Sequence, residues 1–440
     1  MSNVARIPMS MKVGEWLRSD FFSVGVSQTI AALGQIIGVR LLTEALSPAV
    51  FGEVILIVGL STLATSVLVN PTMQAVLRYY PECAQSGDGA PVERTAFQRI
   101  TRNSAIALPL SIPFGILGVV AGWFSLTVLI LLPILVAIDG MRMLRTTVMN
   151  ASRQHHRYGV WQIGEAWGRP VLAYGAIVWW GIHTEIVLGA FIVTSLILYG
   201  VMRYSIDVQP TAIPSREFNE EDLLQKFKDY GRPLIPLGLL GWISGMADRY
   251  MIGSLLSAQN VGMYAAAYGL ASRPLLMLST IAETAIRPVY YSAIARKDWP
   301  ASRKYLLRWF AVVFAAGTAT CVFFALFHQQ IAQVLLGPGF REASHLMPWI
   351  AAGYGLLALY HISVRVCLGH DAPQAVTLTE TVGALLAVAI GFILIREYGL
   401  FGAAVAVPIY CGIQLVASVG LALRSVRPIA SVIEKPTMPL

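Results

Sequence analysis

Long apolar segments alternate with short polar ones along the whole chain. A helix of about 20 apolar residues is long enough to cross roughly 30 Å of hydrocarbon. Backbone groups in lipid must form their hydrogen bonds internally, so segments of this length are expected to be helices. A membrane barrel would instead show short segments of alternating polarity. The pattern therefore predicts an all-α polytopic membrane protein.

We predict twelve spans, six in each half of the sequence. The first six cover residues 21–42, 50–77, 101–121, 124–148, 159–181 and 185–204. The second six cover residues 232–256, 260–287, 304–327, 344–367, 373–395 and 399–423. The longest polar stretch, which contains proline and many charges, separates the two sets. We expect an N-terminal lobe over residues 1–204, a cytoplasmic linker over 205–231, and a C-terminal lobe with a cytoplasmic tail over 232–440.

Basic residues are concentrated on one side of this arrangement. Most of the 32 Lys and Arg residues lie in the N-terminal segment, the linker, the C-terminal tail and the loops on the same side as these. The opposite loops hold few, chiefly Arg341 and Arg396. Cytoplasmic loops carry such an excess, so both termini are predicted to be cytoplasmic. The same bias accounts for the formal charge of +8, and we expect no nucleic-acid partner.

The two halves of the sequence resemble each other. LLTEALSPAVFG is similar to MIGSLLSAQNVG, and HHRYGVWQIGEAWG is similar to HDAPQAVTLTETVG. Gly52 is then equivalent to Gly262, and Arg40 is approximately equivalent to Arg249. Six spans separate the equivalent positions, so both halves have the same orientation. Parallel repeats of this kind place a transport pathway between two lobes.

Charged residues inside spans are costly and are therefore candidate functional residues. Four acid–arginine pairs have helical spacing, which allows the partners to neutralise each other. They are Arg40–Glu44, Asp139–Arg142, Glu165–Arg169 and Glu283–Arg287. Three of these pairs lie near span ends, where long side chains can reach the interface, so structural and functional roles stay equally open. Glu165 and Arg169 lie deeper, beside Pro170, which favours a functional role.

Other charged residues lack a partner on their own helix. Arg273, Arg365 and Glu380 have none, and Arg249 has only its neighbour Asp248, which points to another face. An arginine-lined cavity attracts anions, and one guanidinium can donate two parallel hydrogen bonds to the oxygens of a phosphate. The predicted cationic substrate site consists of Arg40, Arg169, Arg249, Arg273, Arg287 and Arg365. Five acids are either coupling sites or counter-charges for these arginines: Glu165, Glu380, Asp139, Asp248 and Glu283.

Known catalytic motifs are missing from the sequence. It contains neither a G-x-x-x-x-G-K-[ST] loop nor a G-x-S-x-G turn, and the outer loops are too short for a catalytic domain. The four cysteines are far apart and lack metal-type spacing. We therefore expect a protein that moves its substrate, is not an enzyme, and holds no cofactor or metal. Protons, sodium or the membrane potential remain alternative sources of coupling.

Several stretches carry a family resemblance. IIGVRLLTEALSPAVFGEVILIVGL, followed by QAVLRYYPE, resembles the opening of the polysaccharide transporter family. These are the Wzx-type flippases of the multidrug/oligosaccharidyl-lipid/polysaccharide (MOP) superfamily. ADRYMIGSLLSAQNVGMYAAAYGLA resembles the start of that family's second lobe, and YGLFGAAVAVPI resembles its last span.

The resemblance implies two six-helix lobes around a cationic cavity, as in the MATE-like fold, and alternating access. Its implied substrate is an oligosaccharide linked through pyrophosphate to a polyprenyl lipid, flipped across the bacterial inner membrane for surface or exopolysaccharide biosynthesis. The lipid bilayer, a polysaccharide polymerase and glycosyltransferases are the expected partners.

Two other functions stay open. A proton- or sodium-coupled exporter of small drugs would use Glu165 or Glu380 for coupling, although the first span lacks the acid expected in many such relatives. A membrane enzyme or assembly scaffold acting on the same lipid is the third possibility. The lipid II flippase branch ranks lower because it has additional C-terminal helices.

Overall fold

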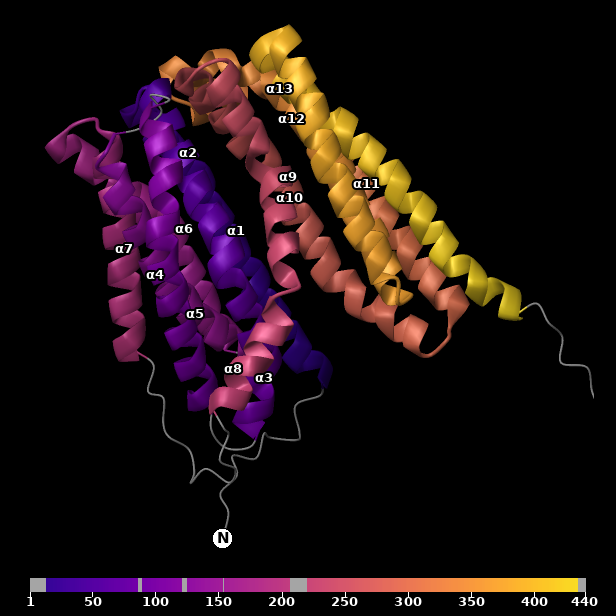
Figure 1. Ribbon diagram of the computed structural model, residues 1–440. Coiled ribbons are helices and arrows are strands. Elements are labelled where there is room, and N and C mark those ends of the chain that lie inside the picture. Colours follow the sequence, from indigo (N-terminus) through magenta and orange to yellow (C-terminus); the bar gives the residue numbers. More distant parts are fainter. Residues whose placement is uncertain (1–12, 86–88, 121–124, 153, 206–219, 434–440) are drawn as a thin grey trace, which may run out of the picture.

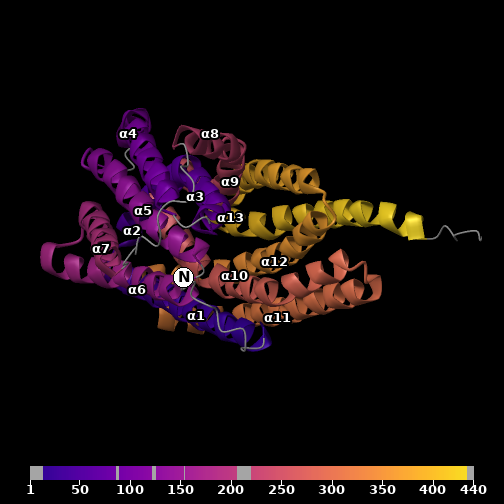
Figure 2. The same cartoon turned by 90° about the horizontal axis from the view of Figure 1, so that it is seen from below.

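The computed structural model describes residues 13–85, 89–120, 125–152, 154–205 and 220–433, and these residues form helices joined by short connections, without strands. The helices make two bundles that lie side by side (Figures 1 and 2). Each bundle contains the helices of one half of the sequence, as the repeat predicts.

The N-terminal lobe contains the first seven α-helices. Their bounds are α1 Val13–Ala45, α2 Pro48–Ala64, α3 Asn70–Gln85, α4 Ala90–Val120, α5 Val128–Ala151, α6 His155–Trp180 and α7 Thr184–Ser205. A π-helical turn, η1 (Thr65–Val69), joins α2 to α3 without a break. Helix α1 packs along α6, and α5 packs between α4 and α7.

The C-terminal lobe contains α9 Leu234–Leu255, α10 Ala258–Ala295, α11 Trp299–Leu335, the 3₁₀-helix η2 Pro338–Leu346, α12 Met347–Gly369 and α13 Pro373–Ile433. Helix α13 is interrupted at Gly399, whose φ of 61° is accessible to glycine without strain. The interruption divides α13 into the two last predicted spans. Helix α12 packs against both α11 and α13.

All twelve predicted spans lie mainly on helices of the structure, and residues 121 and 124, at the facing ends of the third and fourth spans, lie outside the described residues. Among the described residues, six helical stretches are long and apolar enough to cross a membrane by length and composition alone. Most other predicted spans lie on α5, α6, α9 and α10, which carry the charged residues discussed below. Because α2, η1 and α3 follow one another without a break and α13 comprises two helices, each lobe has six long helices within the described ranges. The chain is an all-α, multi-pass membrane protein, and the predicted fold class is confirmed.

The predicted linker contains a helix. Helix α8 (Glu220–Gly231) turns Leu223 and Phe227 toward α3, where both are buried. The Phe227 ring stacks on Tyr79 with 5.9 Å between ring centroids. Residues 206–219 of the linker lie outside the described residues. The contact fixes the end of the linker to the N-terminal lobe.

The two lobes meet at the end that is uppermost in Figure 1 and diverge toward the end where α1 begins and α13 ends. The central contact is between α2 and α10. A Cβ atom at Gly52 would lie 1.9 Å from the carbonyl oxygen of Ala258, and one at Gly262 would lie 2.0 Å from that of Pro48. Only glycine allows the two backbones to approach this closely.

Both helices of this contact begin in the same way. The Ser47 hydroxyl accepts a hydrogen bond from the backbone N–H of Val50 (3.4 Å), and the Ser257 hydroxyl accepts one from that of Asn260 (3.2 Å). A serine cap satisfies a helix N–H that has no partner within the helix. The equivalent caps follow from the equivalent segments of the repeat.

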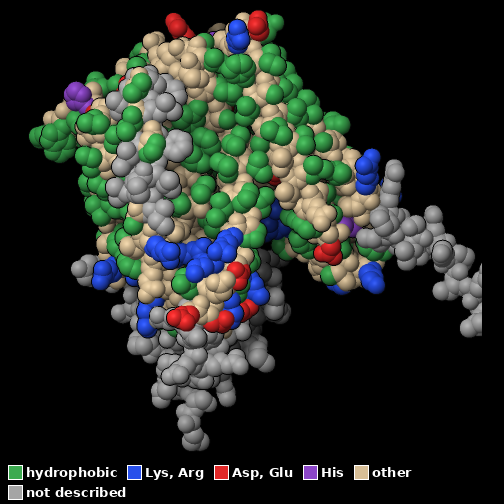
Figure 3. All heavy atoms as spheres, viewed as in Figure 1, with side chains coloured by type: hydrophobic (Ala, Val, Ile, Leu, Met, Phe, Trp, Pro, Cys, Tyr) green, Lys and Arg blue, Asp and Glu red, His purple; other side chains and the backbone are tan. Residues whose placement is uncertain are grey.

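Side chains of α9 close the same end further. The Tyr250 hydroxyl donates to the carbonyl of Leu56 (2.6 Å), and the Trp242 Nε1–H donates to that of Gly59 (2.8 Å). Both acceptors are on α2, so each hydrogen bond joins the two lobes. Apolar side chains cover most of the height of the molecule, and charged side chains gather toward its two ends (Figure 3). This distribution suits a protein embedded in a bilayer.

Candidate functional site

A pocket of about 280 Å³ lies between the lobes. Its walls come from α1 and α6 of the N-terminal lobe and from α10 of the C-terminal lobe. The lining residues are Gly25, Gln28, Thr29, Ala31, Ala32, Gln35, Gln162, Arg273, Leu276, Met277, Thr280, Ile281 and Thr284. The pocket therefore combines one cation with amide, hydroxyl and apolar groups.

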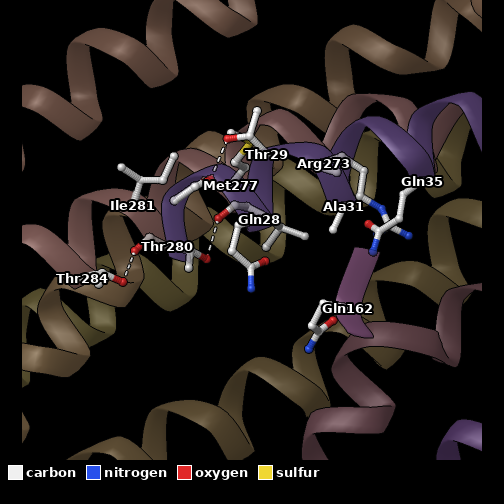
Figure 4. Close-up of a pocket in the computed structure, with 13 residues that line it drawn as sticks. Gln28, Thr29, Ala31, Gln35, Gln162, Arg273, Met277, Thr280, Ile281 and Thr284 are labelled. Carbon is white, nitrogen blue, oxygen red and sulfur yellow. Dashed lines mark hydrogen bonds between the residues drawn. The ribbon is translucent and has the colours of Figure 1, made fainter. Parts of the chain in front are cut away.

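Arg273 is the one charged residue among those that line the pocket. It has no ion-pair partner in the part of the chain that the structure describes, and its side chain is half-buried. Figure 4 shows that the Arg273 and Gln35 side chains extend toward each other at one side of the pocket. Pro274 follows Arg273 and cannot donate a hydrogen bond to the preceding turn of α10.

The hydroxyl groups in the pocket are oriented by their own helices. Thr29 donates to the Gly25 carbonyl, Thr280 to that of Leu276, and Thr284 to that of Thr280, at 2.8–2.9 Å (Figure 4). Each hydroxyl oxygen keeps lone pairs that can accept a hydrogen bond. The amides of Gln28, Gln35 and Gln162 supply both donors and acceptors. Such a surface suits a hydroxyl-rich ligand.

Four charged residues in the N-terminal lobe form one network. Arg169 on α6 donates to both carboxylate oxygens of Asp139 on α5, at 2.6 and 2.7 Å, and Ser195 donates to Asp139 at 2.7 Å. Glu165 accepts two hydrogen bonds from Arg142 and lies 3.5 Å from Arg169. Two pairs predicted from helical spacing, Asp139–Arg142 and Glu165–Arg169, are present. The shortest contacts, however, join α5 to α6. The network contains equal numbers of acids and arginines.

Arg249 is buried among α9, α10 and α12, with 5% of its surface exposed. Its Nη1 lies 2.7 Å from Asp248 Oδ1, and its guanidinium lies 4.0 Å from the ring centroid of Tyr268. The Tyr264 hydroxyl donates to Asp248 at 2.7 Å. The sequence reasoning expected Asp248 to point away from Arg249 and Arg249 to face the cleft. The acid instead pairs with its neighbour: Asp248 Oδ1 accepts from both the backbone N–H and Nη1 of Arg249, and Nη1 also reaches back along the helix to the Gly245 carbonyl. Arg249 is not among the residues that line the pocket.

Glu283 on α10 holds two arginines. It forms an ion pair with Arg287 on the same helix, and its Oε1 lies 3.0 Å from Nε of Arg365 on α12. Arg365 thus finds its partner across helices, as expected for a charge without a partner on its own helix. Glu380 on α13 accepts a hydrogen bond from the Tyr360 hydroxyl at 3.0 Å and has no ion pair among the described residues.

Arg40 lies at the closed end. Its Nη1 lies 2.8 Å from Glu44 and donates to the Leu336 carbonyl at 2.6 Å. The next residue, Gly337, donates its backbone N–H to the Thr43 hydroxyl at 3.0 Å. Arg40 therefore ties the end of α1 to the connection before η2, across the boundary between the lobes.

The structure thus separates the predicted arginines. Arg273 lines the pocket, whereas Arg40, Arg169, Arg249, Arg287 and Arg365 all contact carboxylates outside it. A substrate-binding role for these five stays a prediction, and so does a coupling role for the acids.

Sequence reasoning missed the amide and hydroxyl residues of the pocket. A signal for them exists: polar residues recur on one face of otherwise apolar helices, at Gln28 and Gln35 in α1 and at Thr280 and Thr284 in α10.

A family model described as "Polysaccharide biosynthesis protein" matches residues 124–345, which is half of the chain. No curated protein matches the sequence.

Solved structures share the fold. An inward-facing multidrug resistance MATE family transporter of the MOP superfamily has a TM-score of 0.75 and 14% identity, with 94% of this chain and 99% of that chain covered. An outward-facing structure of a transporter with the same description has a TM-score of 0.63 and 14% identity, with 94% and 97% covered. The lipid II flippase MurJ, in an inward closed conformation, has a TM-score of 0.67 and 13% identity, with 96% and 94% covered.

Proposed function

Because this chain belongs to the polysaccharide biosynthesis protein family, within the MOP superfamily of transporters, we propose that it is a flippase for lipid-linked oligosaccharides. Its substrate would be a polyprenyl-pyrophosphate-linked repeat unit, moved across the bacterial inner membrane for surface or exopolysaccharide biosynthesis. The protein would move this lipid without changing it chemically.

The observation that carries the proposal is the position of Arg273. It is an arginine without an ion pair among the described residues, in a pocket between the two lobes, which would move relative to each other in an alternating-access cycle. An unpaired charge at membrane depth is costly and needs a partner. A pyrophosphate offers several oxygens that the guanidinium can bind in pairs. Substrate binding would therefore supply the counter-charge that the chain lacks at this position.

The rest of the pocket suits the sugar. Gln28 and Gln35 on α1, Gln162 on α6 and Thr280 and Thr284 on α10 can exchange hydrogen bonds with hydroxyl groups. These residues come from both lobes, so the hydrogen bonds that hold the sugar would depend on how the lobes are placed relative to each other. No acid lines the pocket in the described structure, which favours an anionic substrate over a cationic drug.

The shape of the molecule supports an inward-open state. The lobes are closed at the end that contains Gly52 and Arg40 and diverge at the end that carries α8 and many basic residues (Figures 1 and 3). With the basic end in the cytoplasm, the pocket opens toward the side where lipid-linked sugars would be made.

Transport in proteoliposomes tests the proposal. A fluorescent polyprenyl-pyrophosphate sugar is supplied to one leaflet, and its appearance in the other leaflet is measured. Arg273→Gln should lower the initial rate by about 10- to 100-fold, because hydrogen bonds to charged groups contribute about 1.5–3 kcal/mol. Arg273→Lys should retain part of the rate. Arg303→Gln, on the exposed start of α11, is the charge-matched control and should transport normally.

Wild-type protein that failed to move the lipid would contradict the flippase function. Normal transport by Arg273→Gln would contradict only the role of the pocket.

A drug exporter remains the second candidate, because Glu380 has no ion pair among the described residues and could carry a coupling cation or proton. A deletion strain separates the two functions. Loss of exopolysaccharide with unchanged drug resistance supports the flippase, and drug sensitivity with normal exopolysaccharide supports the exporter. Chemical alteration of the lipid-linked sugar by purified protein would instead indicate an enzyme.

A further inference from the structure

Three arginines form a cluster outside the pocket. Arg99 and Arg102 are three residues apart on α4 and therefore lie on one face of that helix. Arg232 follows Gly231, the last residue of α8, and precedes α9. A Cβ atom at Gly231 would lie 3.6 Å from Nη2 of Arg99, so the α8–α9 junction passes directly beside this guanidinium. The cluster joins a helix of the N-terminal lobe to the entry into the C-terminal lobe.

No acid among the described residues forms an ion pair with this cluster. In the described parts of the chain, none of the three side chains forms an ion pair or a hydrogen bond. Nε and Nη1 of Arg99 are enclosed by protein atoms and lack a hydrogen-bond partner. Burial lowers the pKa of the Arg99 guanidinium, and the positive charges of Arg232 and Arg102 lower it further. Because an enclosed, unpartnered cation is costly, a bound anion would be stabilising here.

The position of the cluster identifies the kind of anion. Arg102 and Arg232 are exposed, so a ligand can reach them from the surface. Figure 3 shows a band of Lys and Arg side chains across the N-terminal lobe, at the lower margin of its apolar surface. In a bilayer this margin lies at the level of the lipid headgroups. Basic pockets between helices at this level bind anionic headgroups.

We propose that Arg99, Arg102 and Arg232 bind the phosphate of an anionic phospholipid on the face of the membrane that carries α8. The exposed guanidinium groups of Arg102 and Arg232 would donate hydrogen bonds to the phosphate oxygens, and the more enclosed Arg99 would add its positive charge beside them. The lipid thereby connects α4 to the start of α9. It holds the junction between the lobes without entering the transport pocket.

Lipid-dependent thermal unfolding of the full chain tests this site. The purified protein in neutral detergent is titrated with phosphatidylglycerol, and the midpoint of unfolding is followed. Wild type should be stabilised by phosphatidylglycerol and much less by phosphatidylcholine. Changing all three arginines to glutamine should weaken the apparent affinity for phosphatidylglycerol by about 100-fold, since each basic residue near a surface contributes about fivefold.

A matched variant controls for total charge. Arg303, Lys304 and Arg308 are exposed at the start of α11, in the other lobe, and changing all three to glutamine removes the same charge. This variant should keep the affinity of wild type. Equal loss in both triple variants, or no loss in the first, would overturn the proposal.

A single-residue variant and a titration with soluble anions complete the test. Arg102→Gln alone changes one exposed residue and should fold normally, with an affinity about fivefold weaker. Inorganic phosphate and diphosphate, added without lipid, should not raise the unfolding midpoint. A rise with either ion that depended on the three arginines would assign the site to a soluble phosphate and overturn the lipid assignment.

Discussion

Gly52 on α2 and Gly262 on α10 lie against each other across the boundary between the lobes, and each leaves no room for a Cβ atom. The position of Gly52 faces the carbonyl of Ala258, and the position of Gly262 faces the carbonyl of Pro48. In the internal repeat, Gly52 is equivalent to Gly262, and Pro48 is equivalent to Ala258. The closed end of the molecule is therefore built from one segment used twice.

Gly52→Ala and Gly262→Ala should each open this contact. The added methyl would lie about 2 Å from a backbone oxygen, which a real structure does not tolerate, so α2 and α10 must separate. We expect the unfolding free energy to fall by about 1–3 kcal/mol. Thermal unfolding in detergent measures the effect. Gly175→Ala, in an open region of α6, is the matched control and should change little; an equal loss there would mean that helix propensity or packing elsewhere is responsible.

The same two substitutions should also shift the shape of the molecule. Spin labels at the exposed positions 97 and 307, one in each lobe, report the distance across the wide end. The four free cysteines are first replaced by alanine. Each glycine variant should populate shorter distances than wild type, because the wide end narrows when the opposite end opens. An unchanged distance distribution would show that the lobes do not rotate about the contact between α2 and α10.

Arg40→Gln should weaken the closed end more than Glu44→Gln does. The first change removes both the ion pair and the hydrogen bond to the Leu336 carbonyl, whereas the second leaves the hydrogen bond in place. We expect a loss of about 1–2 kcal/mol for Arg40→Gln and under about 1 kcal/mol for Glu44→Gln. Thermal unfolding of both variants measures the difference. Equal effects would show that the bond to Leu336 contributes nothing.

Arg169→Met should be strongly destabilising. It leaves the carboxylate of Asp139, which is 8% exposed, without its main partner, and loss of one member of a buried pair costs about 3–5 kcal/mol. The double variant with Asp139→Asn should recover part of the loss. Arg287→Gln removes an ion pair whose arginine is 44% exposed and should cost less than about 1 kcal/mol. Unfolding midpoints that rank these variants differently would contradict the buried network.

Tyr268 offers a test of the contact that holds Arg249. Tyr268→Phe keeps the ring beside the guanidinium and loses the hydroxyl, with its contacts to Tyr354 and Arg249, so about 1 kcal/mol should be lost. Tyr268→Leu also removes the cation–π contact, which contributes about 2 kcal/mol where it is desolvated. The two variants are compared by thermal unfolding, and identical midpoints would show that the ring contributes only its volume.

Much of the fold could be predicted because hydrophobic length determines where helices cross a bilayer. The break in α13 at Gly399 was visible as a polar interval between two apolar runs. Helix α8 was not predicted, because its buried residues Leu223 and Phe227 form a short apolar pattern among many charges. Such a pattern becomes informative only when α3 is known to lie beside it.

The candidate site was harder to predict than the fold. Spacing shows which charges share a helix face, so it identified Glu165 beside Arg169 but not Asp139, which approaches from α5. Because no acid lies close to Arg273 on its own helix, it was expected to need a partner elsewhere, and it has no ion pair among the described residues. The same reasoning predicted a partner across helices for Arg365, but it could not identify that partner as Glu283 on α10. Contacts between helices carry the missing information.

The isolated charge of Arg273 makes the proposed transport cycle sensitive to voltage. A bacterial cytoplasm is negative, and one elementary charge that crosses 100 mV changes its energy by about 2.3 kcal/mol. The empty pocket carries one positive charge, so the potential favours the inward-open state. A bound pyrophosphate makes the pocket negative and reverses the direction of the force. The membrane potential would then push the loaded protein outward through the charge of the pyrophosphate and draw the empty protein back through the charge of Arg273, so the pocket would sense voltage with a different charge in each stroke.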